Sequence, residues 1–263
     1  MKSILDHGYL KFIEHWGSDE RIVETARMST NKGFRSWLPY RECRKCLNWD
    51  GDDSVSVECD GAPHDWRDVE KGDAGLLRYL HAHKHSTPFE FAGLTIEAKA
   101  PILVYREWHR HRVPFGYNEM SARYVPLPNE NYSPTIQRII EGAQSAGRNR
   151  QAQGLTSRVP EEAEVQLWLD RLMQSYDLAQ AVYEEGLAIG VPKELARCPV
   201  PVARYSRMRA TGNLRGWLAF LTLRTAPVAQ WEIQQYAWAV SQLIAEHFPR
   251  TYELWAESKP GGP

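Results

Sequence analysis

The sequence predicts an α/β protein of the α+β type, with few strands and several long helices. Residues 94–100 alternate apolar and polar side chains, which is typical of a half-buried strand. Residues 165–183 instead carry apolar side chains at helical spacing, and residues 233–244 do the same. With 263 residues and 43% hydrophobic content, the chain can bury a substantial core, so we expect one domain spanning residues 1–263.

The charge balance and the cysteine count exclude several classes of protein. The formal net charge is -1 and the pI is about 6.8, so no global attraction to nucleic acid or anionic lipid is expected. No apolar run approaches the roughly 18 residues of a membrane span, and the N-terminus lacks a signal-peptide pattern. The 4 cysteines do not make a disulfide framework in a chain of this length. These features predict a cytoplasmic protein that binds neither nucleic acid nor membranes.

Capping and turn signals delimit the elements of the N-terminal half. Gly17-Ser18-Asp19-Glu20 provides an N-cap for a helix, and Pro101 fits the first turn of another. In order, we expect an edge strand at 4–13, a helix ending at 28–30, a short helix at 74–83, a strand at 94–100 and a helix from Pro101 to Arg112.

The C-terminal half is predicted to be mainly helical. Residues 137–158 are rich in Gly, Ala, Gln, Ser and Arg, which predicts a mobile polar surface segment. A long helix then begins at Pro160 and ends at Gly190. Its apolar face, which belongs to the core or to a subunit contact, comprises Val165, Trp168, Leu169, Leu172, Tyr176, Ala179 and Tyr183. Further helices are expected after Pro192, at 218–224 and from 229 to Pro249.

Residues 110–124 read RHRVPFGYNEMSARY and combine three arginines, a histidine and a glutamate in one short stretch. Arg110, His111 and Arg112 are consecutive, so on a helix they splay across its surface and can contact two different ligands. Pro114 and Gly116 end that helix, and a polar loop is expected to follow. Amide, carboxylate, hydroxyl and guanidinium groups that can bind a phosphate and a sugar hydroxyl come from Asn118, Glu119, Ser121 and Arg123. A solvated helix end with surface salt bridges is the alternative.

This stretch resembles the signature of the flavin-dependent thymidylate synthases, the ThyX family, in which Arg-His-Arg is followed by Asn-Glu-x-Ser-x-Arg-Tyr. Further similarities lie in the turn with His85, Thr87 and Glu90, in the Asn-x-Arg segment ahead of a helix ending at Arg224, and in residues 229–237. These motifs occur in the family's order. The resemblance implies a ThyX-like fold with a small, mostly antiparallel sheet and several long helices, assembled as a homotetramer.

The resemblance implies reductive methylation at carbon 5 of a uridylate, dUMP or UMP. FAD would be the cofactor, methylenetetrahydrofolate the carbon donor and NADPH the reductant. A guanidinium beside the uracil imide would stabilise the imide anion while staying charged, so Arg224 is the candidate activator. Cys198 has no histidine placed to activate it, so a thiolate nucleophile is not expected. The implied catalytic residues are Arg224, His85 and Tyr124.

The resemblance assigns the remaining site residues to two ligands. Binding of the nucleotide is implied for Glu107, Arg110, Glu119, Ser121, Ala122, Arg123, Arg197 and Arg224. Binding of the flavin is implied for Ser29, Thr87, Glu90, Arg110, His111, Arg112, Asn213 and Arg215.

The sequence departs from the family pattern at three places near these ligands. Eight residues, Val113 to Met120, separate Arg112 from Ser121, where the family usually has seven. Glu107 stands where the family often has a glutamine, and Ala219 stands where it has His or Asn. These departures are similar to those of the uridylate methylases of polyoxin-type nucleoside antibiotic pathways, which accept UMP. The choice between dUMP and UMP therefore stays open, because one loop residue can make room for a ribose hydroxyl.

Residues 31–73 have no obvious counterpart in the family pattern and are interpreted as an insertion. Cys43, Cys46, Cys59 and His64 follow the spacing C-x2-C-x12-C-x4-H, which could surround a tetrahedral zinc ion. Residues 54–58 would form a short strand leading to the third ligand. Reduced thiols packed beneath a tryptophan-rich loop are the alternative, and the spacing leaves both open.

Two other functions remain as alternatives at this stage. One is a uridylate hydroxymethylase on the same fold. The other is a zinc-bearing module that binds phosphate or RNA without catalysis, which predicts no yellow colour on purification and a salt-dependent affinity for nucleic acid.

Overall fold

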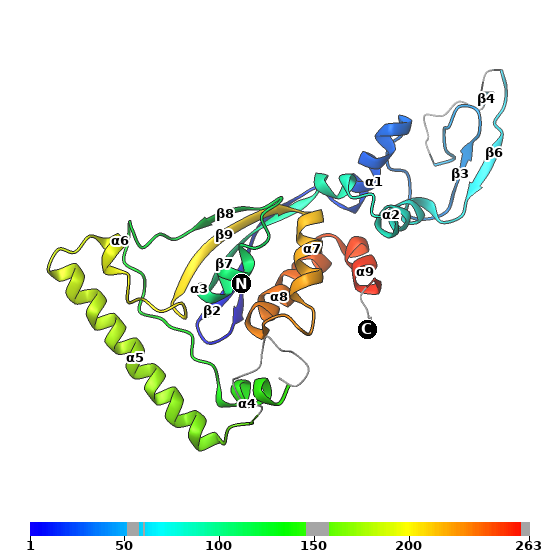
Figure 1. Cartoon of the computed structure of the whole chain (residues 1–263). Helices are drawn as coiled ribbons and strands as arrows, with labels where there is room; N and C mark the ends of the chain where they lie inside the picture. Colours follow the sequence, from blue (N-terminus) through cyan, green and yellow to red (C-terminus); the bar gives the residue numbers. More distant parts are fainter. Residues whose placement is uncertain (52–57, 60, 146–157, 259–263) are drawn as a thin grey trace. The chain divides into compact units, whose positions relative to one another are not determined.

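The computed structural model describes residues 1–51, 58–59, 61–145 and 158–258 (Figure 1). Its largest sheet has five strands in the order β1-β2-β7-β9-β8. These strands are β1 (Lys2–Ile4), β2 (Gly8–Trp16), β7 (Gly93–Pro101), β9 (Tyr205–Asn213) and β8 (Gly116–Glu119). The edge pairs β1–β2 and β8–β9 are antiparallel. A small sheet accompanied by several long helices confirms the predicted fold class.

Strand β7 shows why the alternating pattern was informative. Leu94, Ile96 and Ala98 are fully buried, whereas the residues between them are only partly buried. The buried Tyr105 hydroxyl then joins β7 to β9: it accepts a hydrogen bond from the Ala100 N–H at 3.1 Å and lies 2.7 Å and 2.9 Å from the carbonyl oxygens of Ala98 and Ser206. The strand predicted at 94–100 is therefore confirmed.

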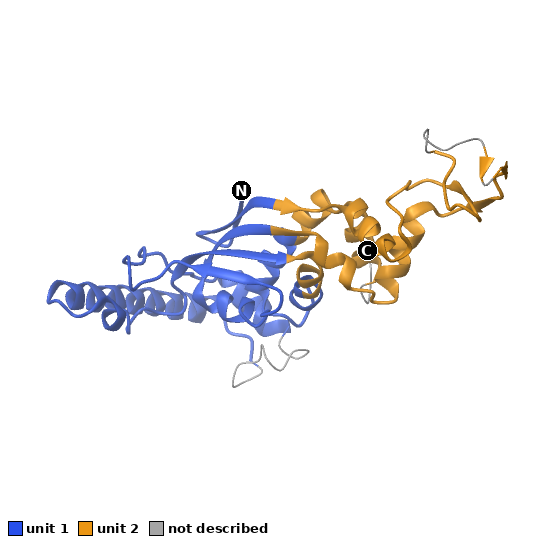
Figure 2. Cartoon of the chain, turned by 90° about the horizontal axis from the view of Figure 1, so that it is seen from above, with its two compact units in different colours: residues 1–14, 95–212, 220–240 blue, residues 15–94, 213–219, 241–263 orange. Residues whose placement is uncertain are grey.

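The chain divides into two compact units, coloured separately in Figure 2. The first comprises residues 1–14, 95–212 and 220–240. It holds most of the sheet, α3 (Ile102–Trp108), α4 (Ile136–Ser145), α5 (Glu162–Ala188), α6 (Lys193–Ala196) and parts of α7 (Leu214–Arg224) and α8 (Trp231–His247). In its core the Trp108 ring stacks on Phe220 with centroids 5.0 Å apart, and it meets Tyr236 of α8 at 5.9 Å. The α8 face predicted to be internal is buried.

Helix α5 begins at a capping box and buries one stripe of side chains. The Glu161 side chain accepts a hydrogen bond from the Glu164 N–H, and the Glu164 side chain accepts one from the Glu161 N–H. Val165, Leu169, Tyr176 and Tyr183 are buried as predicted. Trp168 is 51% exposed, so within the single chain it lies outside the buried stripe, and of the two predicted roles only a subunit contact remains open to it. One position from Leu169 is about 100° around the helix, which carries the indole out of the stripe.

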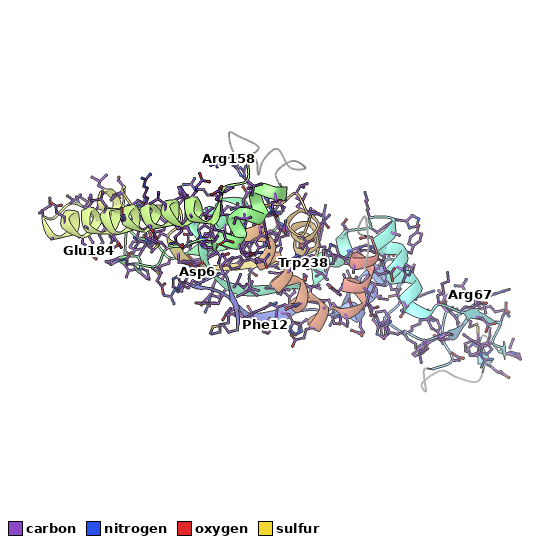
Figure 3. The ribbon with its side chains drawn as sticks, turned by 90° about the horizontal axis from the view of Figure 1, so that it is seen from below. Asp6, Phe12, Arg67, Arg158, Glu184 and Trp238 are labelled. Atoms are coloured by element: carbon purple, nitrogen blue, oxygen red, sulfur yellow. The ribbon has the colours of Figure 1, made fainter. Side chains whose placement is uncertain are left out.

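A second cluster in the first unit attaches α5 to the sheet. Tyr132, Tyr176, Ala203 and Tyr205 pack together, and the Tyr176 hydroxyl donates to the Tyr132 carbonyl at 3.1 Å. Asp6, labelled in Figure 3, lies in the turn between β1 and β2. Its carboxylate accepts hydrogen bonds from the Tyr205 hydroxyl at 2.5 Å and from the Ser133 N–H at 3.0 Å. The edge of the sheet and the segment preceding α4 are therefore linked.

The second unit comprises residues 15–94, 213–219 and 241–263. It contains α1 (Asp19–Arg27), the short 3-10 helices η1 (Met28–Thr30) and η2 (Thr87–Phe91), α2 (Gly72–Ala82) and α9 (Pro249–Glu257). The Ser18 hydroxyl caps α1 by accepting from the Arg21 N–H at 3.2 Å, as predicted. Two small sheets pair β3 (Tyr40–Cys43) with β6 (Trp66–Val69) and β4 (Glu58–Cys59) with β5 (Ala62–Pro63).

Buried carboxylates connect residues 31–73 to the helices of the second unit. Asp73 is fully buried and pairs with the guanidinium of Arg27, and it accepts from the Arg35 N–H at 2.7 Å. Glu42, also buried, pairs with Lys32, with Arg35 and, at 2.9 Å, with Arg67. Such groups are stable in a protein interior only when paired, so this region is built into the unit by specific ion pairs.

Two segments around residues 101–119 differ from expectation. The helix from Pro101 ends at Trp108, not Arg112. Beyond its end the Tyr117 hydroxyl lies 3.3 Å and 2.6 Å from the carbonyl oxygens of Trp108 and His111, so a side chain supplies one of these carbonyl groups with the donor that a continuing helix would have provided. The polar loop predicted at 118–119 is strand β8, because residues 116–119 pair in register with β9.

Other boundaries also differ. The strand expected at 4–13 is two strands joined by a turn in which Leu5 has φ +58. The polar segment predicted at 137–158 begins as helix α4, which is attached by Arg138 to Glu232 at 3.0 Å. Its remainder up to 157 lies outside the described residues, as do residues 54–57 of the predicted strand 54–58. Among the described residues, no helix combines the length and apolar character needed to cross a bilayer.

Candidate active site

The C-terminus of α7 brings Arg224 to the end of α3. Arg224 Nη1 donates to Glu107 Oε2 at 2.6 Å and Nη2 donates to the Glu107 carbonyl oxygen at 2.9 Å. Its Nε donates to His111 Nε2 at 2.9 Å. A cation near the C-terminus of a helix is favoured by the helix dipole. The three residues form one cluster although Arg224 and Glu107 are 117 positions apart in the chain.

His111 is held as a neutral imidazole. Its ring meets the edge of Phe220 at 5.0 Å, and its Nε2 can accept from Arg224 only when unprotonated. Burial lowers the pKa of His111, and the Arg224 charge lowers it further, to about 4, against a smaller opposing effect of Glu107. At neutral pH this cluster therefore carries one cation, one carboxylate and one neutral acceptor.

A second cluster joins residues 121–124 to α6. The Ser121 hydroxyl accepts from the Arg123 N–H at 3.3 Å, and Arg123 Nε lies 3.0 Å from Glu194. Arg197 Nε donates to the Glu194 carbonyl oxygen at 3.3 Å. Arg123 and Arg197 are both exposed, so their guanidinium groups remain open to an anion from solvent. Arg123 and Arg197 come from distant parts of the sequence and both contact Glu194.

The other residues expected at the nucleotide also belong to the first unit. Ala122 is buried, so only its backbone groups can contact a ligand. Tyr124 is 80% exposed, and its carbonyl oxygen accepts from Lys193 Nζ at 3.0 Å. Arg110 and Arg112 are exposed beyond the end of α3, whereas Glu119 is half-buried on β8.

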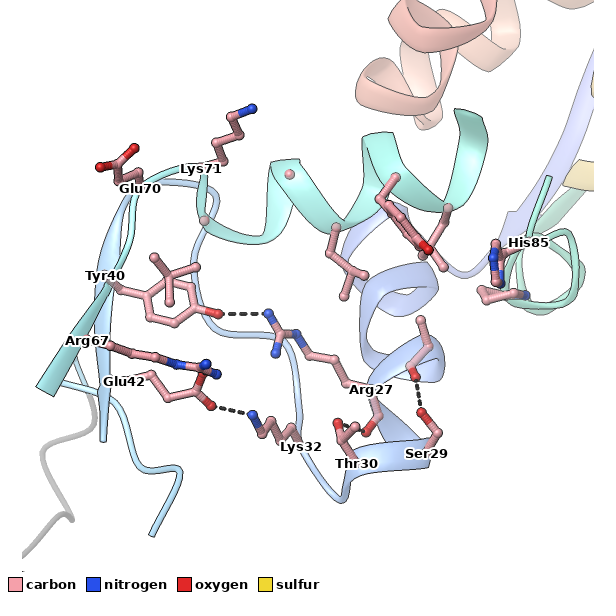
Figure 4. A pocket seen from close by; sticks show the side chains of 18 of the residues that line it. Arg27, Ser29, Thr30, Lys32, Tyr40, Glu42, Arg67, Glu70, Lys71 and His85 are labelled. Carbon is pink, nitrogen blue, oxygen red and sulfur yellow. Dashed lines mark hydrogen bonds and ion pairs between the residues drawn. The ribbon is translucent and has the colours of Figure 1, made fainter. Parts of the chain in front are cut away.

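Most of the residues expected at the flavin belong to the second unit. A cavity of about 950 Å³ there is lined by Ser29, His85 and Thr87 (Figure 4). Tyr40 adds an aromatic ring. The charged lining residues are four cations and three carboxylates: Arg27, Lys32, Arg67, Lys71, Glu42, Asp68 and Glu70. The volume is at the upper end of the roughly 300–1,000 Å³ typical of ligand sites. Arg27 Nε is buried without a hydrogen-bond partner among the described residues.

The remaining flavin residues are engaged with their neighbours. Glu90 and Arg215 form an exposed ion pair. The Asn213 side chain accepts from the Gly216 N–H at 3.0 Å, which caps the start of α7. His111 and Arg112, assigned to the flavin by resemblance, lie in the first unit instead. The structure therefore brings together Ser29, His85 and Thr87 in one cavity and Glu90 with Arg215 in a pair.

Sequence reasoning missed the part that residues 31–73 play in this cavity. Tyr40, Glu42 and Arg67 come from strands β3 and β6 and line it together with the predicted residues. Figure 4 shows the Tyr40 hydroxyl directed at Arg27 and Glu42 directed at Lys32. The one available signal was the alternation of acidic and basic residues in this stretch, which by itself indicates only a solvated surface.

Comparison with known proteins identifies the family. Residues 11–250 match the model of the Thy1 family, described as thymidylate synthase complementing protein. The chain is 34% identical over 254 residues to the flavin-dependent thymidylate synthase of Thermosipho africanus, covering 96% of this chain and 92% of that protein. It is 31% identical over 254 residues to that of Thermus thermophilus, covering 97% and 77%.

Solved structures agree with the sequence relatives. The UMP/dUMP methylase PolB from Streptomyces cacaoi bound with 5-Br dUMP superposes with a TM-score of 0.71 at 26% identity, covering 98% of this chain and 97% of that chain. The same enzyme bound with 5-Br UMP gives a TM-score of 0.70 at 25% identity, with the same coverage. A family match over most of the chain, relatives above 30% identity and a shared fold lead to one conclusion: this chain belongs to the flavin-dependent thymidylate synthase (Thy1) family.

Proposed function

We propose that this protein methylates carbon 5 of a uridylate, accepting dUMP and UMP, with FAD as cofactor, methylenetetrahydrofolate as carbon donor and NADPH as reductant. Family membership supports the reaction class. The observation that carries the proposal is the Arg224, Glu107 and His111 cluster, because it holds one guanidinium in a fixed direction beside a neutral imidazole. A zinc-bearing module that only binds RNA has no use for that arrangement, and membership of an enzyme family argues against it.

Arg224 is suited to activate a uracil ring. Its Nε and one N–H of each Nη are used by His111 and Glu107, so within the described residues one N–H on each Nη remains for a ligand. That pair can donate to the imide edge of uracil and stabilise the anion formed when the imide proton passes to solvent water. The negative charge makes carbon 5 nucleophilic without a covalent enzyme nucleophile. Glu107 and His111 fix the guanidinium before substrate arrives, which reduces the cost of reorganisation.

The Ser121, Arg123 and Arg197 cluster is the proposed phosphate site. Both guanidinium groups are exposed, and an incoming phosphate can replace Glu194 as the partner of Arg123. Ser121 would contribute its hydroxyl and Ala122 its backbone N–H. Arg110 and Glu119, assigned only by resemblance, complete the proposed nucleotide site, and Tyr124 keeps the catalytic role that the resemblance gives it.

The cavity of the second unit is the proposed place for part of the flavin. FAD supplies the hydride that completes the methyl group when it is bound. Ser29, His85 and Thr87 would contact it by hydrogen bonds, and Lys71 would attract its phosphates, since Arg27 and Lys32 already pair with Asp73 and Glu42. Glu90, Arg112, Asn213 and Arg215, with Arg110 and His111, are the further proposed flavin contacts.

Both sugars are proposed as substrates because PolB, similar to this chain over nearly its full length, was crystallised with analogues of both dUMP and UMP. The eight-residue segment between Arg112 and Ser121 supports the same proposal, since extra length near the nucleotide can make room for a 2′-hydroxyl.

We also propose a homotetramer. Leu167, Trp168 and Leu178 leave an exposed apolar strip on α5 that a second copy could cover.

A side-by-side tritium-release assay tests the function. Purified protein receives dUMP or UMP labelled at carbon 5, together with FAD, NADPH and methylenetetrahydrofolate. We expect release from both nucleotides and a yellow protein with a flavin spectrum. Release from dUMP alone would restrict the enzyme to deoxyribonucleotides. Release from neither, in protein that retains FAD, would overturn the proposal, and product analysis distinguishes a methyl from a hydroxymethyl group.

A further inference from the structure

Four potential metal ligands converge in the second unit, in a region to which the proposed reaction assigns no role. One donor atom each from Cys43, Cys46, Cys59 and His64 lies within 4.8 Å of all the others. The Cys46 sulfur is 3.4 Å from His64 Nδ1. Around a tetrahedral zinc ion, with Zn–S about 2.3 Å and Zn–N about 2.0 Å, neighbouring sulfur and nitrogen ligands are about 3.5 Å apart. The distance between Cys46 and His64 already matches such a site, and the other ligand atoms lie close to it.

Two hairpins deliver these ligands. Cys43 ends β3 and Cys46 lies in the turn that follows, where the Leu47 N–H bonds to the Cys43 carbonyl oxygen at 3.0 Å. Cys59 ends β4, and His64 comes directly after β5. Leu47 at φ +61 and Gly61 at φ +72 adopt left-handed conformations that turn the chain sharply beside the ligands. Cys43 and Cys46 thus come from a strand end and the turn after it, and Cys59 and His64 come from the ends of the two paired strands β4 and β5.

Backbone groups around Cys43 support a bound thiolate. The N–H groups of Lys45 and Cys46 are directed toward the Cys43 sulfur. Donors of this kind reduce the negative charge on a metal-bound sulfur and orient it. The Cys43 N–H meanwhile bonds to the Asn48 carbonyl oxygen at 2.8 Å, and the Arg44 N–H bonds to the Asp65 carbonyl oxygen at 2.8 Å. The turn is therefore fixed on both sides of the cluster.

The region has too small an apolar core to hold this geometry by packing. Among the described residues of 31–73, the buried hydrophobic side chains are Tyr40, Cys43 and Cys59. Two of these three are the proposed ligands themselves. Its short sheets β3–β6 and β4–β5 cannot be stabilised by so little burial, and segments of this size usually need a disulfide or a metal. A disulfide would join two of the three cysteines and leave the histidine without a role.

We propose that Cys43, Cys46, Cys59 and His64 bind one structural zinc ion per chain. Three thiolates and one imidazole form a ligand set that prefers zinc in tetrahedral geometry. Four protein ligands leave no open position, so the ion takes no part in the methylation. Its role is to hold β3 and β6, and these strands carry Tyr40, Glu42 and Arg67 to the cavity described above.

Elemental analysis of the purified full-length protein tests the site. We expect about one zinc per chain after desalting, and loss of at least about nine-tenths of it in the variants Cys59→Ser and His64→Ala. Cys198→Ser is the matched control, because Cys198 is a free cysteine outside the cluster and should leave the zinc content unchanged. Cobalt substitution adds a second readout: a tetrahedral site with three thiolates gives strong visible absorption that Cys59→Ser reduces.

Two results would overturn the proposed zinc site. Protein grown with ample zinc, carrying four reactive thiols after denaturation and no bound metal, would overturn the proposal. A disulfide among Cys43, Cys46 and Cys59, detected by mass spectrometry without reduction, would overturn it as well. If Cys59→Ser fails to fold, zinc release from the wild-type protein on blocking thiols with a mercurial reagent still decides the question, because the released ion is counted directly. None of these outcomes depends on the methylation activity.

Discussion

Arg224 binds both the side chain and the main chain of Glu107, at 2.6 Å to the carboxylate and 2.9 Å to the carbonyl oxygen. The two bonds fix the guanidinium plane at the end of α3, and the bond from Nε to His111 removes the remaining rotation. An arginine held by its surroundings on three sides can present its other N–H groups to a ligand in one direction.

Arg224→Ala should abolish methylation while leaving the fold intact. Removal of a preorganised donor at the developing charge costs at least about a hundredfold in kcat. Arg224→Lys is the informative comparison, because it keeps the charge but cannot make the paired contacts, and it should also lose most of its activity. Tritium release at saturating nucleotide measures the effect, with circular dichroism as the control for folding. Turnover close to wild type in Arg224→Ala would remove Arg224 from the mechanism.

Glu107→Gln should tighten nucleotide binding. The amide oxygen can still accept from Arg224 Nη1, so the guanidinium keeps its direction, but the carboxylate charge near an anionic substrate disappears. We expect KM for the nucleotide to fall severalfold with a smaller change in kcat. Glu257→Gln, which alters the exposed ion pair with Arg78 away from both proposed ligands, is the control for a general charge effect. A raised KM would mean that the Glu107 carboxylate itself binds the sugar or the base.

His111 should remain neutral well below its ordinary titration range. Because burial and Arg224 lower its folded-state pKa to about 4, the unfolded chain binds a proton first as the pH falls. Stability from this group is therefore fully present above about pH 6.5 and is lost progressively as the pH falls toward 4. NMR titration of labelled histidines measures this pKa directly. In Arg224→Ala the pKa should rise but stay below its usual value, since burial remains; an ordinary pKa in the wild type contradicts the cluster.

Asp19 should matter for stability and not for catalysis. It is buried at the start of α1 and accepts from the Thr251 hydroxyl at 2.6 Å and from the N–H groups of Arg250 and Thr251 at 2.8 Å and 3.2 Å. It thereby caps α9 from another helix. Asp19→Ala should lower the free energy of unfolding by about 2–3 kcal/mol, because these donors lose their acceptor. Asp19→Asn keeps one acceptor oxygen and should cost less. Urea unfolding measures both, and equal losses would argue against the capping role.

Removal of the proposed zinc ion should weaken flavin binding. Tyr40, Glu42 and Arg67 line the cavity from β3 and β6, so loosening these strands disturbs its surface. We expect the Kd for FAD to rise at least about tenfold after chelation, with recovery when zinc is returned. Cys198→Ser treated in the same way is the control. Unchanged FAD affinity in protein shown to have lost its zinc would mean that this cavity does not bind the flavin.

Local patterns in the sequence predicted much of the secondary structure and several of the site residues of this protein. The Ser18 cap, the alternation along β7, the buried face of α8 and the motif around Arg110 to Arg123 depend on neighbouring residues, so they can be read in order along the chain. The spacing of Cys43, Cys46, Cys59 and His64 likewise indicated a possible metal site, although reduced thiols explained it equally well.

Tertiary structure decided what depends on residues far apart in the chain. Strand β8 forms because residues 116–119 pair with β9, and no local sequence pattern reveals this partner. Glu107 contacts Arg224, which lies 117 positions further along the chain. Residues 31–73, interpreted from the sequence as an insertion, line part of a cavity in the folded protein. The reason is physical: hydrogen-bond partners, burial and the resulting pKa of His111 arise only when distant segments exclude water together.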